Sequence, residues 1–136
     1  MAGEIKVHLR SISASASEAT LGRHQVLIDR PAAKGGEDMG PMGGELFLAA
    51  VGGCFMSNLL AAIKAREANI SDIRTEVIGI LADSPTRFAA VELCVTADSP
   101  DRELLDRLVE IADRNCIMMN TLRGKLDVKL RIGTPV

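Results

Sequence analysis

Hydrophobic and polar residues alternate along the first part of the chain, a pattern typical of strands. In residues 4–16, Ile5 and Val7 share one face with Leu9, and the apolar parity switches near position 10, which predicts a strand with a bulge. Residues 17–22 predict a turn, and residues 23–29 predict the hairpin partner. A loop rich in Gly and Pro follows over residues 30–44, and such long loops are usually functional.

A helix is predicted over residues 44–67, and it is apolar on every side as far as Ile63. No residue is charged from Leu46 to Ile63, a length at the lower limit for crossing a membrane. Against a membrane span stand Gly52 and Gly53, the lack of a second span, and the amphipathic strands on both sides. We therefore expect a buried central helix in a protein without a membrane partner.

Two long strands are predicted after this helix, over residues 72–83 and 87–98. In the second, the apolar side chains at odd positions share one face, and Cys94 lies on the opposite face. Residues 125–132 alternate without a break and predict the last strand.

The segment of residues 99–116 carries the signals of an amphipathic helix. Ser99 is its predicted N-cap, and Pro100 suits the first helical position. Its predicted apolar stripe consists of Leu104, Leu108, Ile111 and Ala112. Cys116 follows this stripe, so it points toward the core if the helix continues.

These elements follow one another in the order β-β-α-β-β-α-β. They predict a single α+β domain over residues 1–136, in which an antiparallel sheet wraps around a long buried central helix. About five strands cover only one side of that helix. The uncovered side predicts an obligate, intertwined homodimer with the central helices at the interface.

Composition removes several classes of function. With three Phe, no Trp and no Tyr, the chain lacks the aromatic platform of single-stranded nucleic-acid binders, and its net charge of −2 gives no sign of nucleic acid. The N-terminus shows no apolar signal segment, which with three cysteines predicts a reducing, cytoplasmic location. No Cys/His cluster occurs in the sequence, so neither a metal nor another cofactor is predicted.

Cys54 lies in the apolar helix, and Cys116 lies at the end of the second helix. Two helices packed on one sheet could bring these cysteines within the Cα separation that a disulfide requires. Taken singly, each cysteine is more simply a small buried hydrophobe, Cys94 above all. Gly52 and Gly53, directly before Cys54, indicate either close approach of another group or helix packing across the dimer.

Two separated segments resemble the OsmC/Ohr family of thiol-dependent peroxidases. Residues 29–65 read DRPAAKGGEDMGPMGGELFLAAVGGCFMSNLLAAIKA and are similar to the OsmC-related pattern of Asp-x-Pro, Gly-Gly-x-Asp-x-Gly-Pro and Glu-Leu-Leu-x-Ala-x-Gly-x-Cys. Residues 115–132 read NCIMMNTLRGKLDVKLRI and are similar to the second-cysteine segment of that family. The resemblance spans residues 23–132.

This resemblance implies a hydroperoxide reductase that acts in oxidative stress defence. The Cys54 thiolate would attack an organic hydroperoxide or hydrogen peroxide and become a sulfenic acid, which Cys116 would resolve to a disulfide. A small dithiol or lipoyl-type reductant would then restore both thiols. Glu45 matches the family's acidic residue, whose partner is an arginine that holds the thiolate. Arg30 and Arg23 are both candidates for that arginine, and Arg30 is favoured because it borders the loop before the helix.

The sequence also departs from the family pattern. Ile117 stands where a Pro usually follows the second cysteine, and Gly43 replaces a Pro before the acidic position. On a continuous helix Glu45 and Cys54 would lie about 13.5 Å and about 180° apart, so either the helix breaks at residues 52–53 or Glu45 serves a site across the dimer. Two alternatives to the enzyme are a dimer of this fold that binds an apolar or acyl small molecule and a structural dimer with inert thiols.

Overall fold

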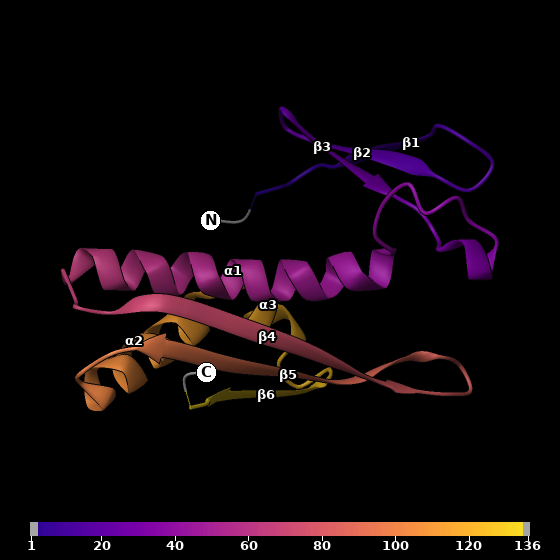
Figure 1. The fold of residues 1–136 in the computed structure, drawn as a ribbon. Helices are drawn as coiled ribbons and strands as arrows, with labels where there is room; N and C mark the ends of the chain where they lie inside the picture. The colour runs from indigo at the N-terminus through magenta and orange to yellow at the C-terminus, as the bar shows by residue number, and fades with distance from the viewer. Residues whose placement is uncertain (1–2, 135–136) are drawn as a thin grey trace. The chain divides into compact units, whose positions relative to one another are not determined.

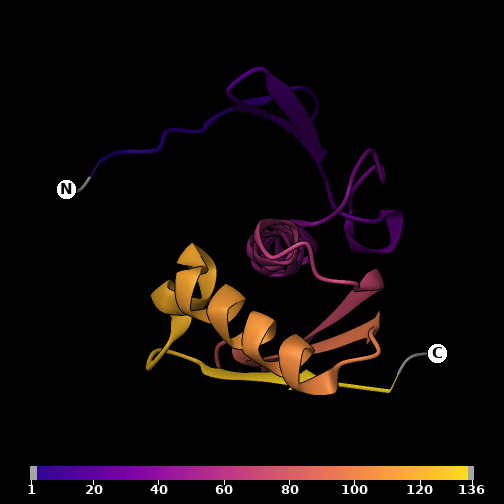
Figure 2. The ribbon, with the colours of Figure 1, turned by 90° about the vertical axis from the view of Figure 1, so that its left-hand side faces the viewer.

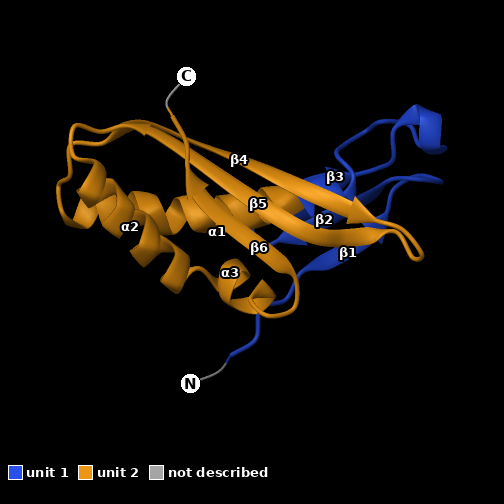
Figure 3. Cartoon of the chain, turned by 90° about the horizontal axis from the view of Figure 1, so that it is seen from below, with its two compact units in different colours: residues 1–47 blue, residues 48–136 orange. Residues whose placement is uncertain are grey.

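The chain divides after Phe47 into two units, which Figure 3 shows in blue and orange. The structure is a computed structural model and describes residues 3–134. The division falls inside the longest helix, α1 (Gly43–Ala65). Each unit has a three-stranded sheet of its own.

The first unit contains β1 (His8–Ser11), β2 (Ser17–Leu21) and β3 (His24–Ile28), all antiparallel, and a short 3-10 turn, η1 (Ala32–Lys34). The prediction of one strand over residues 4–16 and a turn after it was wrong, because residues 17–21 form the middle strand. The chain reverses one segment earlier, where the Ser13 hydroxyl accepts the N–H groups of residues 15 and 16 at 3.2 and 2.9 Å. The parity switch read from the sequence marks this reversal, which leads from one strand into the next.

The sheet of the second unit is formed by β4 (Ser71–Ala82), β5 (Arg87–Asp98) and β6 (Asp127–Ile132). Strands β4 and β5 are antiparallel, but β6 runs parallel to β5, so the prediction of an all-antiparallel sheet needs correction. A parallel neighbour requires a crossover connection. Two helices supply it, α2 (Arg102–Asn115) and α3 (Ile117–Leu122). The described chain thus has one helix more than predicted, α3, and one strand more, β2.

Helix α1 packs along β4 through one side of its surface. A Cβ atom at Gly52 would lie 2.7 Å from Cγ2 of Val77, so the absence of a side chain at position 52 brings the helix onto the strand. One turn later, the Thr75 hydroxyl donates to the Met56 sulfur at 3.0 Å. Helices α1 and α2 cover the same face of the sheet (Figures 1 and 2), and Val91, Leu93 and Val95 of β5 are fully buried on that face.

Helix α2 begins later than predicted. Its N-cap is Asp101, whose carboxylate accepts the Leu104 N–H at 3.0 Å, and Ser99 lies outside the helix. The buried stripe consists of Leu105, Leu108, Val109 and Ala112, so the prediction is right for Leu108 and Ala112 and wrong for Leu104 and Ile111. A carboxylate at the cap also favours the positive end of the helix dipole.

By length and composition, α1 could cross a membrane, a property that core helices share. Its contacts with β4 are those of a core helix. Its buried residues are Val51, Gly52, Phe55, Leu59, Ala62 and Ile63.

Candidate functional site

Cys116 lies at the corner between α2 and α3, where the backbone is extended (φ −81°, ψ 118°). Its N–H donates to the Asp113 carbonyl at 3.2 Å, which ends α2. Its sulfur accepts the Met119 N–H at 3.5 Å, which caps the beginning of α3. The predicted inward position of Cys116 is confirmed, since the residue is fully buried, although the helix does not continue through it.

Cys54 lies on α1 and faces this corner, and it is half-buried. The Asn58 amide donates to the Cys54 sulfur at 3.9 Å and to the Cys54 carbonyl at 2.9 Å. Burial raises the pKa of the Cys54 thiol, but hydrogen bonds from the Met118 N–H, the Cys116 thiol and the Ile117 N–H outweigh it, so the pKa lies below its ordinary value.

The pKa of the Cys116 thiol moves in the opposite direction. Burial raises it, the hydrogen bond to Cys54 and the negative charge of Cys54 raise it further, and the Met119 N–H only partly offsets these effects. The pair therefore favours a thiolate on the half-exposed Cys54 and a neutral thiol on the buried Cys116. This arrangement suits a nucleophile that reacts first and a second thiol that attacks the oxidised product.

Ile117 contributes to this site through its backbone. A Pro at this position, as in the family pattern, would have no N–H to donate to Cys54. The Ile117 side chain is 66% exposed, so the observed contribution of the residue to the thiol pair is its N–H.

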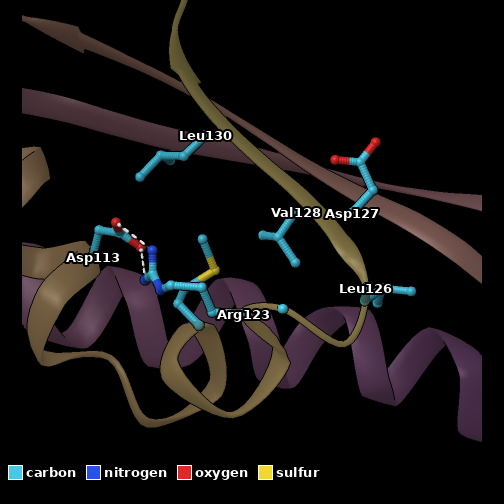
Figure 4. Close-up of a pocket in the computed structure, with 8 residues that line it drawn as sticks. Asp113, Arg123, Leu126, Asp127, Val128 and Leu130 are labelled. Atoms are coloured by element: carbon cyan, nitrogen blue, oxygen red, sulfur yellow. Dashed lines mark hydrogen bonds and ion pairs between the residues drawn. The ribbon is translucent and has the colours of Figure 1, made fainter.

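Arg123 is a residue of the site that the sequence did not identify. Its guanidinium pairs with the Asp113 carboxylate at 2.9 Å, and its pKa is raised by that hydrogen bond, by the charge of Asp113 and by the charge of Cys116. Figure 4 shows the ion pair at one side of a cavity of about 410 Å³, which is otherwise lined by residues such as Val128 and Leu130 of β6. The signal in the sequence that could have pointed to Arg123 was its position seven residues after Cys116, just beyond the short helix.

Glu45 makes a capping bond at the start of α1. Its carboxylate accepts the Met42 N–H at 3.0 Å, as a glutamate in the third helical position does in a capping box. Helix α1 is unbroken through residues 52–53, so the first of the two alternatives, a break in the helix, is not observed. Arg23, in the turn between β2 and β3, and Arg30, just after β3, are both exposed. Glu45, Arg23 and Arg30 belong to the first unit, and their roles toward Cys54 stay predictions.

The Gly-rich loop of residues 30–44 is organised by a buried carboxylate. Asp29 is 3% exposed and accepts the N–H groups of Arg30, Glu37 and Met39 at 2.7, 3.1 and 3.2 Å. Burial raises the pKa of Asp29, but these bonds and one from the Ser15 hydroxyl outweigh it, so the pKa lies below its ordinary value. In the first unit, the Asp of the Asp-x-Pro motif therefore holds the loop in shape.

Cys94 lies on the other face of the sheet, as predicted. It is half-buried and pairs in register with Glu76 of β4 and Arg131 of β6, away from Cys54 and Cys116. Among the described residues, no group of three or more His, Cys, Asp and Glu side chains could hold a metal ion.

Comparison with known proteins gives a family model described as OsmC-like protein, which matches residues 35–131. The organic hydroperoxide resistance protein OhrB of Bacillus subtilis is 29% identical, with a TM-score of 0.68 over 96% of this chain and 98% of that chain. An OsmC-like protein from Mycoplasma pneumoniae is 17% identical, with a TM-score of 0.84 over 100% of both chains. An organic hydroperoxide resistance protein OsmC from Legionella pneumophila is 22% identical, with a TM-score of 0.73 over 96% and 97%. The curated proteins give no match.

Proposed function

Because the chain belongs to the family of OsmC-like proteins, we propose that it is a thiol-dependent hydroperoxide reductase with Cys54 as the peroxidatic and Cys116 as the resolving cysteine. Structures named as organic hydroperoxide resistance proteins share its fold, which supports a role in defence against oxidative stress. Organic hydroperoxides are the proposed substrates, with hydrogen peroxide as the alternative.

The observation that carries this proposal is the hydrogen-bonded pair of thiols with opposite pKa shifts. The Cys54 thiolate attacks the terminal oxygen of the hydroperoxide, the O–O bond breaks, and the alkoxide takes up a proton and leaves as an alcohol. Cys54 is then a sulfenic acid and Cys116 a thiol in contact with it. Their condensation releases water and forms a disulfide, which a small dithiol or lipoyl-type reductant reduces by thiol–disulfide exchange.

Intact mass after one equivalent of cumene hydroperoxide tests the assignment. Wild type is expected to lose two hydrogens, and Cys116→Ser to gain one oxygen as a trapped sulfenic acid. Serine suits position 116 because its hydroxyl can cap α3 in place of the sulfur. Cys54→Ser is expected to show no rapid, saturable oxidation. Equal, slow oxidation of all three proteins would refute the peroxidase and leave the ligand-binding or structural alternatives.

The homodimer is also a proposal, and the open face of α1 supports it. Small and apolar residues face outward there, and Leu60 is 47% exposed. The exposed positions are Ala49, Ala50, Gly53, Ser57, Leu60 and Ala61. Sedimentation of wild type and Leu60→Glu tests this, since a charge in a helix interface is expected to weaken the dimer. An identical dimer in Leu60→Glu would place the interface elsewhere.

A further inference from the structure

Four hydrogen-bonded links close a ring around Cys116. The Cys116 N–H donates to the Asp113 carbonyl, and the Met119 N–H donates to the Cys116 sulfur. The Arg123 N–H donates to the Met119 carbonyl at 3.0 Å, and the Arg123 guanidinium returns to the Asp113 carboxylate. The last link alone joins two side chains, so substitution of either one can remove it and leave the other three links in place.

This last link is a two-pronged ion pair. Nη2 of Arg123 lies 2.9 Å from Oδ1 of Asp113, and Nη1 lies 3.4 Å from Oδ2 (Figure 4). Two parallel bonds fix orientation better than one contact does. Because Asp113 lies in the last turn of α2 and Arg123 directly follows α3, the pair ties the two helices together at the corner that holds Cys116.

We propose that Arg123 is a positioning residue for disulfide formation, in which it holds the Cys116 sulfur against the oxidised Cys54. This inference rests on the proposed function. In the step concerned, the Cys116 thiolate forms a bond to the Cys54 sulfur, and the S–O bond of the sulfenic acid breaks. The leaving hydroxide takes up the proton that Cys116 released and becomes water, while the hydroperoxide has already supplied the oxidising equivalents.

The charge of Arg123 acts on the same step. Within residues 3–134, Cys54 of α1 acts on Cys116 through its hydrogen bond and charge, and the charge of Cys116 acts on Arg123, which is paired with Asp113 of α2. Asp127 of β6 lines the cavity beside Arg123. Arg123 carries the one positive charge in this set. A nearby cation favours the thiolate that must attack, against the burial that disfavours it. Positioning and charge therefore support the same step.

The test follows each oxidation state of the full-length protein over time. Reduced protein is mixed with cumene hydroperoxide, quenched with acid at intervals and weighed intact, across a range of pH. In Arg123→Met, the sulfenic acid is expected to accumulate, disulfide formation to slow by a factor on the order of ten at neutral pH, and its pH dependence to move upward. Arg123→Lys is expected to restore the pH dependence, because it keeps the charge. Arg114→Met, which removes an exposed ion pair from the same turn of α2, is the matched control and is expected to behave as wild type.

A second variant, Asp113→Asn, weakens the ion pair and keeps the guanidinium. It is expected to slow disulfide formation without moving its pH dependence upward. The inference is overturned if Arg123→Met forms the disulfide with the rate and pH dependence of wild type. It is also overturned if Arg123→Met forms the disulfide slowly and Arg123→Lys does not restore the wild-type pH dependence. If wild type itself forms no disulfide, the proposed function fails first, and this result is distinct from a failure confined to the Arg123 variants.

Discussion

Replacing Ile117 with Pro is expected to remove one hydrogen-bond donor from Cys54 and to change little else. Proline has no N–H, and the first position of a helix is where that group is not needed within the helix. Proline also requires an extended residue before it, and Cys116 already has φ −81° and ψ 118°. The substitution is therefore compatible with the backbone on both sides.

The size of the effect follows from the donors that remain. A hydrogen bond to a charged group contributes about 1.5–3 kcal/mol. Because Cys54 is half-buried and keeps the Met118 N–H and the Asn58 amide as donors, we take the loss of the Ile117 bond to cost the thiolate about 1 kcal/mol. This cost lowers the ratio of thiolate to thiol about fivefold. The pKa of the Cys54 thiol is thus expected to rise, and its reactivity at pH values below that pKa to fall by a similar factor.

Alkylation by iodoacetamide across pH measures this change, since the thiolate is the reacting form. The background carries Cys94→Ser and Cys116→Ser, so that Cys54 is the one thiol left, and Ile117→Val serves as the control that keeps the N–H. Circular dichroism checks that the fold is retained. Identical pH profiles for the Pro and Val variants would refute a role of the Ile117 N–H.

Three further predictions concern the helix, the loop and the exposed arginines. Gly52→Ala is expected to lower the free energy of unfolding by about 1 kcal/mol, because crowding against a β4 methyl costs about 1–3 kcal/mol and helix propensity returns about 1 kcal/mol. Gly53→Ala has open space around its Cβ and is expected to raise the free energy of unfolding; both are measured by urea titration in the Leu60→Glu background, in which the proposed dimer is weakened. Asp29→Asn is expected to speed proteolysis in the loop of residues 30–44. Because the folded pKa of Asp29 is depressed, its stabilisation is present above the ordinary value of 3.8 and is lost as pH falls through the folded pKa, so wild type and variant are expected to converge in acid. Arg30→Met or Arg23→Met is expected to slow peroxide reduction without moving the alkylation profile of Cys54, and a moved profile would mean that the arginine also helps to ionise Cys54.

The three longest elements could be predicted from the sequence almost to the residue. Strand β5 was predicted with its observed bounds, and α1 and β4 within two residues, because the two strands alternate regularly and α1 is one long apolar run. Strand β2 was missed because SEATL is short and mostly polar, so that composition favoured a turn. The parallel direction of β6 was missed for a different reason, since alternation fixes which face is buried and says nothing of strand direction.

The candidate site was predictable only where side chains define it. The sequence placed Cys54 and Cys116 on two helices that could meet, and in the structure the two thiols lie close enough for each to shift the pKa of the other. The N–H donors at the corner could not be predicted, because every residue except proline carries one. Ile117 in place of Pro was the one visible trace of them. Arg123 was missed because its contact with Asp113 depends on where α2 ends, which the sequence placed one residue too far along.

These donors change the argument for a cation at Cys54. A thiol buried among apolar groups stays protonated without help, and the sequence therefore predicted an arginine to hold the thiolate. Within the second unit, the Met118 and Ile117 N–H groups and the Cys116 thiol already lower the Cys54 pKa. We therefore expect an arginine from the first unit or from a second copy to contribute less to forming the thiolate than the sequence alone predicted. We expect its main task to be to orient the peroxide and to stabilise the negative charge that develops on the leaving oxygen, a role that would change the rate of peroxide reduction and not the ionisation of Cys54.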